Sequence, residues 1–311
     1  RSQRGGPWSP PRSNSGQWEW QLTGGARLGS VAHGAVSVAA MSEAFIVEAV
    51  RTPVGRRGGG LSQIHPADLG GHVIQALMER SKVDPAAVDD VVFGCLDQIG
   101  PQSGDIARTC ALVGGLPEHV PGVTVDRQCG SAQQAVHFAA QAVMSGTMDV
   151  VIAGGVQNMS QIPIGSAGRL GRDDDFSPFT SSERWQTIYG NGEVSQFVGA
   201  EMMVDKWDLT REELEDFAVE SHRRALRAQA EGRFDNEIVP IAGVTRDEGP
   251  REPDLDKIRS LPTLSPGGKV TAAVASQISD GSAAMLIMNE AAVERHGVTP
   301  RARISTSSSA T

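Results

Sequence analysis

Cys129 is the residue of this sequence best placed to do chemistry. It follows a short apolar, strand-like run at 123–125 and precedes a helix-like run that begins at Gly130. A thiol at a helix N-terminus lies beside unpaired backbone N–H groups and the positive end of the helix dipole, and both favour the thiolate. A thiolate with N–H donors beside it can attack a carbonyl and have the resulting oxyanion stabilised. The position therefore predicts acyl transfer through Cys129.

The other two cysteines have a different setting. Cys95 follows the apolar run 91–93, and Cys110 lies inside the helix-like run 106–112. Both are predicted to be small buried hydrophobes. An odd number of cysteines without C-x-x-C spacing indicates neither a disulfide framework nor a zinc site, and the seven scattered histidines predict no metal site. Reduced cysteines fit a cytoplasmic protein.

Composition excludes several function classes. The 311 residues, 39% of them hydrophobic, can bury a sizeable core in one or two domains. No uninterrupted apolar stretch reaches 18 residues, so we expect no membrane span. The net charge of -9 disfavours nucleic acid, and any site for an anionic ligand must be locally basic. Two glycine-rich segments, 55–60 and 267–269, lack the features of a phosphate-binding loop and are predicted turns.

The elements that must position Cys129 alternate between strands and helices. Apolar and helical periods predict strands at 45–50, 91–93, 123–125 and 150–153, the last ending in a Gly-Gly turn, and helices at 66–80, 105–113 and 130–145. After residue 280 the rhythm returns with an apolar run at 283–288, a helix at 291–296 and a strand at 301–305. This order predicts a parallel or mixed sheet with helices on both faces.

Two stretches depart from this rhythm. Residues 1–40 hold three of the five tryptophans and show no sustained period, which predicts a disordered extension rather than a targeting segment. Residues 159–279 predict an inserted subdomain with one strong helix, which begins at a capping box of Thr210 and Glu213 and stops at Gly232. Its predicted core-facing stripe is Leu214, Phe217, Ala218 and Ala225.

Five segments resemble one family in its order. Residues 125–132, Val-Asp-Arg-Gln-Cys-Gly-Ser-Ala, resemble the nucleophile segment of the thiolases, and the others are 51–55, 153–160, 231–240 and 276–281. The resemblance implies an α/β thiolase-like half-domain, a mixed sheet with helices on both faces, with an inserted α-rich loop subdomain. The predicted division is a disordered extension at 1–40, the first part of the N-terminal core at 41–158, the inserted loop subdomain at 159–279, the last strand and helix of the core at 280–304, and a tail outside the family at 305–311.

The resemblance also implies a reaction and a substrate. It is acyl transfer between acyl-CoA thioesters, either thiolysis of a 3-ketoacyl-CoA by CoA or the reverse Claisen condensation of acetyl-CoA, through an acyl-enzyme on Cys129. Coenzyme A is then a substrate, and no cofactor is bound permanently. Ser276 stands where thiolases contact the pantetheine arm, Arg251 where they hold the adenine nucleotide, and Leu264 where an apolar wall lies beside the arm. Gln196 and Phe197 replace a common Met-Gly pair, so acyl preference is not inherited from the family.

The resemblance stops at Ile304. Nothing in the sequence resembles the Asn-Glu-Ala-Phe, Gly-His-Pro and Cys-x-Gly segments from which thiolases draw their base and second cysteine. Base and proton-transfer roles each contribute roughly 10²–10⁴-fold, so we expect this chain by itself to be nearly inactive. We interpret it as a fragment that holds the N-terminal half of a thiolase, which at full length is expected to form a homodimer or homotetramer. A related condensing enzyme of the ketoacyl-synthase type and a non-catalytic CoA-binding or assembly fragment are the alternative interpretations.

Overall fold

The computed structural model describes residues 42–169, 177–192 and 194–305, which lie within one compact unit of residues 41–311. The predicted extension at 1–40 and all but the first residue of the predicted tail at 305–311 lie outside the described residues.

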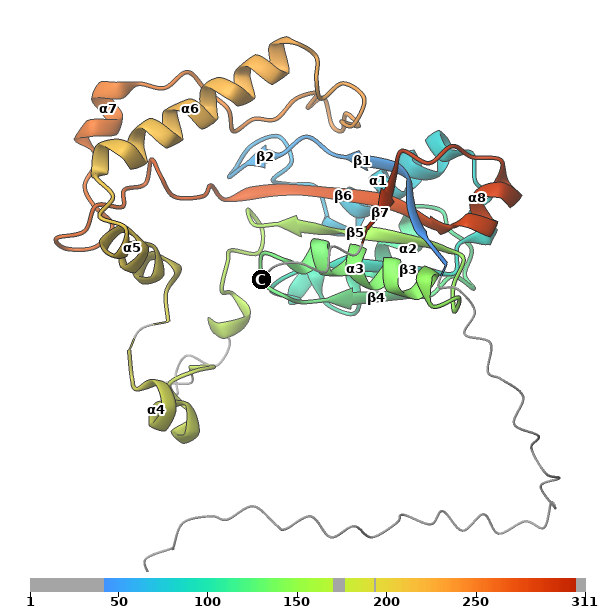
Figure 1. Cartoon of the computed structure of the whole chain (residues 1–311), viewed down its shortest axis with the longest axis horizontal. Helices are drawn as coiled ribbons and strands as arrows, with labels where there is room; N and C mark the ends of the chain where they lie inside the picture. Colours follow the sequence, from blue (N-terminus) through green and yellow to red (C-terminus); the bar gives the residue numbers. More distant parts are fainter. Residues whose placement is uncertain (1–41, 170–176, 193, 306–311) are drawn as a thin grey trace, which may run out of the picture. The chain divides into compact units, whose positions relative to one another are not determined.

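A mixed sheet of seven strands forms the core of the described residues (Figure 1). The neighbour order is β4-β3-β5-β6-β1-β7, and β2 pairs with β6. Pairing is parallel between β4, β3 and β5 and antiparallel elsewhere. The strands are β1 (Ala44–Arg51), β2 (Gly55–Arg56), β3 (Asp90–Gly94), β4 (Gly122–Val125), β5 (Val150–Asn158), β6 (Ser279–Asn289) and β7 (Ala302–Ile304).

Helices cover both faces of this sheet, as predicted. On β3, Val91 and Phe93 join one hydrophobic cluster and Val92 joins the other, because alternate residues of a strand face opposite sides. The first cluster includes the buried residues of α1 and α2, and the second includes those of α3. The helices of this region are α1 (Pro66–Ser81), α2 (Ile106–Val113), α3 (Ser131–Met144) and α8 (Glu290–His296).

Strand β5 is longer than the sequence predicted. The expected Gly-Gly turn after residue 153 is wrong, because Gly154 and Gly155 continue the strand to Asn158. A Cβ on Gly154 would lie 2.0 Å from the carbonyl oxygen of Ala283, and one on Gly155 would lie 2.6 Å from that of Gly94. These glycines therefore permit close packing between strands.

The inserted segment holds four α-helices in its described part: α4 (Glu183–Tyr189), α5 (Gln196–Lys206), α6 (Arg211–Ala230) and α7 (Leu255–Ser260). The capping box at the start of α6 is confirmed. Its predicted core-facing stripe is wrong, since Phe217 is 79% exposed while Glu215 and Val219 are buried. Glu215 tolerates burial because Arg211 pairs with it at 2.7 Å.

Candidate active site

Cys129 lies in a tight turn between β4 and α3. Gln128, directly before it, has a left-handed backbone with φ of +49°, and Gly130 is the N-cap of α3. A left-handed conformation at a residue other than glycine is strained and is held in place by its surroundings. Cys129, the next residue, is exposed. The sequence indicated the cysteine and the helix start but gave no signal for the strain at Gln128.

Local hydrogen bonds hold the strained turn. The Ser131 hydroxyl accepts from the N–H of Arg127 at 2.8 Å and donates to the carbonyl of Gln128 at 2.6 Å. The carboxylate of Asp126 accepts from the N–H of Gln128 at 2.8 Å. The N–H groups of Gly130 and Ser131 donate to the carbonyls of Arg127 and Gln128. These two donors, which the sequence-based hypothesis left unpaired beside the thiol, therefore stabilise the turn itself.

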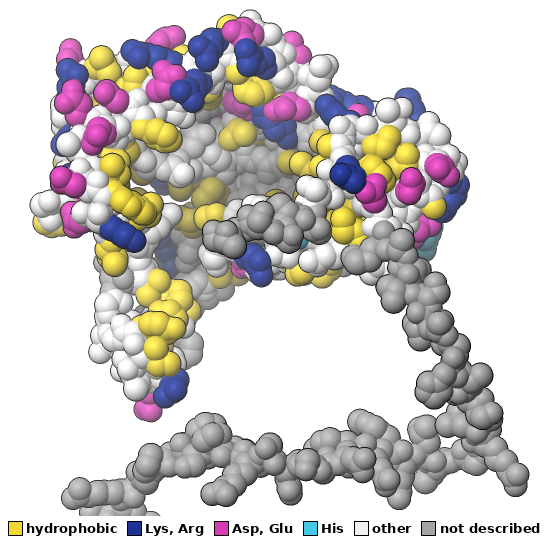
Figure 2. Space-filling model, viewed as in Figure 1, with side chains coloured by type: hydrophobic (Ala, Val, Ile, Leu, Met, Phe, Trp, Pro, Cys, Tyr) yellow, Lys and Arg dark blue, Asp and Glu magenta, His cyan; other side chains and the backbone are white. Residues whose placement is uncertain are grey.

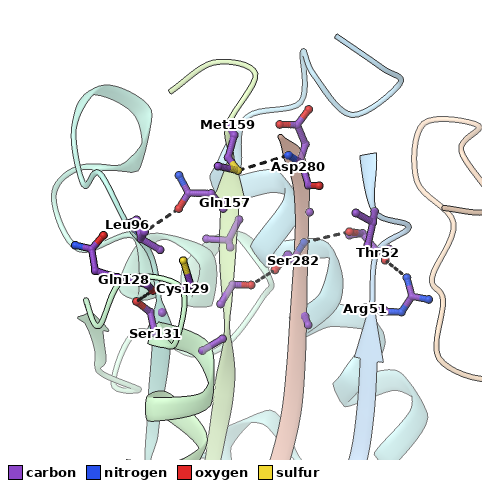
Figure 3. Close-up of a pocket in the computed structure, with 18 residues that line it drawn as sticks. Arg51, Thr52, Leu96, Gln128, Cys129, Ser131, Gln157, Met159, Asp280 and Ser282 are labelled. Carbon is purple, nitrogen blue, oxygen red and sulfur yellow. Dashed lines mark hydrogen bonds between the residues drawn. The ribbon is translucent and has the colours of Figure 1, made fainter. Parts of the chain in front are cut away.

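A cavity of about 350 Å³ opens above Cys129 (Figure 3). Its floor consists of strand ends, because β3, β5 and β6 each contribute residues to it. The lining residues are Arg51, Thr52, Val54, Gly94, Leu96, Gln128, Cys129, Ser131, Ala132, Gly155, Val156, Gln157, Met159 and Ser279 to Ala283.

The start of α3 packs directly on the sheet at Gly94. A Cβ at this position would lie 2.4 Å from the backbone nitrogen of Ala132 and 2.7 Å from the Cβ of Ser131. Real Cβ atoms do not approach other atoms so closely, so only glycine lets the helix come this near. Gly94 thereby allows the start of α3, and with it Cys129, to lie close to the sheet.

Cys95 and Cys110 are buried, as predicted. Burial, followed by nearby charges, raises the pKa of each thiol to about 12. The Cys95 thiol donates to the carbonyl of Leu96 at 3.3 Å, and Cys110 packs close to Gly70 in α1. Neither lies in the lining of the cavity, so the described structure offers one accessible sulfur nucleophile, Cys129.

Several polar residues of the cavity wall had no predicted role. The Gln157 amide oxygen accepts from the N–H of Leu96 at 3.0 Å, and Asp280 accepts from the N–H and hydroxyl of Ser160 at 2.8 and 2.6 Å. The Thr52 hydroxyl accepts from the N–H of Ser282 at 3.1 Å. The family-like segments contained these residues, but only the antiparallel register of β5 and β6, which pairs Asn158 with Asp280, brings them together.

A second cavity, of about 450 Å³, lies in the inserted segment. It brings together two of the predicted CoA-binding residues, Arg251 and Ser276, while Leu264 does not line it. The lining residues from α6 are Phe217, Ala218, Ser221, His222 and Ala225, and the others lie in 249–251 and 272–277. The exposed position of Phe217 therefore has an explanation, because its ring forms part of the cavity wall.

His222 and Arg251 share this second cavity. The N–H of Arg251 donates to the Nδ1 of His222 at 3.4 Å. Burial, and then the charge of Arg251, lowers the pKa of His222 below its ordinary value of 6.5. At neutral pH the positive charge in this cavity is therefore carried by the arginine, and the imidazole is neutral.

The described residues contain no group of three or more His, Cys, Asp and Glu side chains that could hold a metal ion. Within the same residues, no helix has both the length and the apolar character needed to cross a membrane.

The fold and the site define an α/β protein with one accessible cysteine at a helix start, facing a cavity at the strand ends. Residues 44–291 match the N-terminal domain of the thiolases. The chain belongs to the thiolase family.

Individual relatives agree with this assignment. The chain is 55% identical to the steroid 3-ketoacyl-CoA thiolase FadA6 of Mycobacterium tuberculosis, over 86% of this chain and 67% of that protein. It is 38% identical to the beta-ketoadipyl-CoA thiolase of Acinetobacter baylyi, over 85% of this chain and 70% of the relative. A crystal structure of the acetyl-CoA acetyltransferase of Bacillus anthracis superposes with a TM-score of 0.68 at 34% identity, covering 85% of this chain and 70% of the other.

Proposed function

We propose that Cys129 of this chain accepts an acyl group from an acyl-CoA as part of thiolase-type acyl transfer. The observation that carries the proposal is the exposed thiol of Cys129, held by a strained turn at the start of α3 and facing a cavity on the sheet.

The first half of the reaction follows from this geometry. The Cys129 sulfur attacks the keto carbon of a 3-ketoacyl-CoA and forms a C–S bond, and the oxyanion then collapses. The carbon–carbon bond to acetyl-CoA breaks, and its electron pair leaves as an enolate that takes up a proton. In the second half, a CoA thiolate attacks the acyl-enzyme and releases Cys129. Transfer between two thiols is nearly isoenergetic, which suits a cysteine intermediate.

The second cavity is the proposed place for the nucleotide part of the CoA molecule. Arg251 offers charge-assisted hydrogen bonds to phosphate, and Phe217 offers an aromatic face. Ser276 lines this cavity and Ser279, three residues later, lines the cavity of Cys129. Because an extended chain advances at most about 3.6 Å per residue, the two cavities are separated along this segment by a short distance that a pantetheine arm can cover. Arg251 and Ser276 are the proposed CoA contacts, with Leu264 beside the arm.

The proposed substrate class is 3-ketoacyl-CoA, since relatives named as 3-ketoacyl-CoA thiolases align with most of this chain. The 55% identical relative is named as a steroid 3-ketoacyl-CoA thiolase. A bulky polycyclic 3-ketoacyl-CoA is therefore a substrate to compare with acetoacetyl-CoA. CoA enters as a substrate rather than as a resident cofactor. We further propose a cytoplasmic location, in agreement with the three free cysteines, and a homodimer or homotetramer for the full-length protein.

The proposal is tested by single-turnover acylation. Incubated for several hours with excess acetyl-CoA, the chain is expected to release up to about one CoA per chain and then stop, measured by chromatography, because acylation is slow and ends when Cys129 is fully acylated. Cys129→Ala removes this release of CoA, and Cys95→Ala keeps it. A calorimetric titration with CoA separates the alternative of a non-catalytic binding module, which would bind CoA saturably and release no CoA from acetyl-CoA.

A further inference from the structure

Arg51, the last residue of β1, lies where the catalytic sheet meets the inserted segment. Its guanidinium donates to Glu237 from Nε at 2.7 Å and to both oxygens of Asp247, from Nη1 at 2.6 Å and Nη2 at 3.1 Å. Its charged carbon lies 5.2 Å from the centre of the Phe234 ring. One side chain therefore contacts three residues of the inserted segment, and it also lines the cavity of Cys129.

The backbone of Arg51 strengthens the same junction. Its N–H donates to the carbonyl of Glu237 at 2.9 Å, and its carbonyl accepts from the N–H of Val239 at 2.8 Å. The next residue, Thr52, accepts from the N–H of Ser282 in β6, a strand that lines the cavity of Cys129. Arg51 thus belongs to the rigid sheet on one side and to the inserted segment on the other.

Asp247 and Glu248 connect residues 51–60 to the segment that lines the second cavity. The Asp247 carboxylate is 12% exposed and also accepts from the N–H of Val54 at 2.8 Å. The N–H of Glu248 donates to the carbonyl of Val54, and its carboxylate accepts from the N–H groups of Arg56 and Gly60. Gly249, Pro250 and Arg251 follow directly and line the second cavity. The contacts that Asp247 and Glu248 make with residues 51–60 therefore hold the backbone that leads to Arg251 against the sheet.

We propose that Arg51 is a positioning residue that aligns the nucleotide-binding cavity with Cys129 by holding Asp247. This inference rests on the proposed function. A bidentate arginine–carboxylate pair gives directional as well as energetic coupling, and the side chain of Arg51 is only 20% exposed. Without the Arg51 side chain, residues 247–251 can shift relative to the sheet. An acyl donor bound through its nucleotide then holds its thioester away from the Cys129 sulfur.

Two acyl donors separate positioning from general damage. Acetyl-CoA carries the nucleotide, whereas S-acetyl-N-acetylcysteamine carries the same thioester without it. We compare the second-order rate constants for acylation of Cys129 by the two donors, measured by intact mass. Arg51→Ala is expected to slow acylation by acetyl-CoA about 10–100-fold, since a misplacement of about 1 Å can cost this much. Arg51 also lines the cavity of Cys129, so acylation by the short donor should slow too, but at least about 5-fold less than acylation by acetyl-CoA.

Two further variants keep the test valid if Arg51→Ala does not fold. Arg51→Lys keeps the cation but cannot reach Glu237 and both oxygens of Asp247, and Asp247→Asn keeps an acceptor for Val54 but removes the charge. Both are expected to show the same donor-selective loss. The matched control is Arg295→Ala, which breaks an arginine–aspartate pair with Asp149 at the opposite end of β5, and it should slow neither donor.

The outcomes are distinct. An equal slowing of both donors, or no slowing of either, would overturn the positioning role of Arg51 while leaving the acyl-enzyme intact. Acylation of the wild-type chain by neither donor would instead overturn the proposed function, and the inference with it.

Discussion

The two cavities of this chain are built in different ways. The cavity of Cys129 is lined by the ends of strands, and backbone hydrogen bonds between β3, β5 and β6 fix how these strands are aligned. The close packing of α3 on Gly94 and the strained turn at Gln128 position Cys129. The second cavity lies between one helix and two irregular segments, which side-chain hydrogen bonds connect to the sheet. The proposed acyl transfer thus depends on residues held by the sheet, whereas the proposed CoA recognition depends on a few polar contacts.

Burial follows the same division. Most residues of both hydrophobic clusters come from the sheet and from the helices that cover it, whereas Val239, Ile241 and Val244 of the inserted segment are only partly buried against the first cluster. In contrast, α4 and α5 expose large apolar side chains, and Figure 2 shows hydrophobic side chains at the surface over these helices. The exposed residues are Ile188, Tyr189, Phe197, Val198, Met202 and Met203. We therefore expect substitutions in the inserted segment to change binding more than stability, and substitutions under Cys129 to do the reverse.

The largest expected contrast is among the three thiols. With iodoacetamide at pH 8, Cys129 should be labelled in the folded chain, and Cys95 and Cys110 only after unfolding. Their raised pKa of about 12 leaves about one thiolate in ten thousand at this pH, and burial blocks the reagent. Digestion and mass spectrometry at successive times give the three rates. Labelling of Cys95 as fast as Cys129 would show that the sheet is open.

Gly94→Ala tests the contact under the catalytic turn. The added methyl group overlaps the first turn of α3, so we expect a loss of about 1–3 kcal/mol of folding free energy together with a displaced thiol. Urea unfolding measures the loss. Gly130→Ala is the matched control in the same turn, because a Cβ there meets nothing closer than 3.5 Å. Equal stability of the two variants would show that the close packing of α3 on Gly94 is wrong.

Substitutions in the second cavity should affect binding alone. Arg251→Ala is expected to weaken CoA binding about tenfold, because a hydrogen bond to a charged group is worth about 1.5–3 kcal/mol and this one is solvent-exposed. Ser276→Ala should have a smaller effect in the same direction, and Leu264→Ala, outside the cavity lining, the least. Calorimetric titration with CoA gives the three values. A larger loss of CoA affinity in Leu264→Ala than in Arg251→Ala would show that CoA binds elsewhere than in the second cavity.

The smallest effect concerns pH. Because the pKa of His222 is lowered in the folded chain, the unfolded chain takes up its proton first as the pH falls through 6.5. His222 therefore makes folding less favourable with decreasing pH, until the folded form is protonated too. Unfolding of wild type and His222→Asn at several values between pH 7.5 and 5 should show a weaker pH dependence in the variant. Parallel curves would contradict the stated environment of His222.

Much of the sheet could be predicted from the sequence, because buried strands and α1 carry clear apolar periods. The helix start at Cys129 was predictable for the same reason. Three helices of the inserted segment were missed, although Ser182, Ser195 and Asp254 are caps that could have indicated α4, α5 and α7. The cavity walls were beyond sequence reasoning, since β-sheet register brings Gln157 and Asp280 together across more than a hundred residues.

Cys129, and neither buried thiol, is the proposed acceptor of the acyl group. Peptide mapping after several hours of incubation with acetoacetyl-CoA at neutral pH, with quenching in acid, tests this assignment directly. We expect at most one acetyl group per chain, on the peptide that contains Cys129. Acetyl groups on the peptides of Cys95 or Cys110, with Cys129 unmodified, would show that the assignment is wrong.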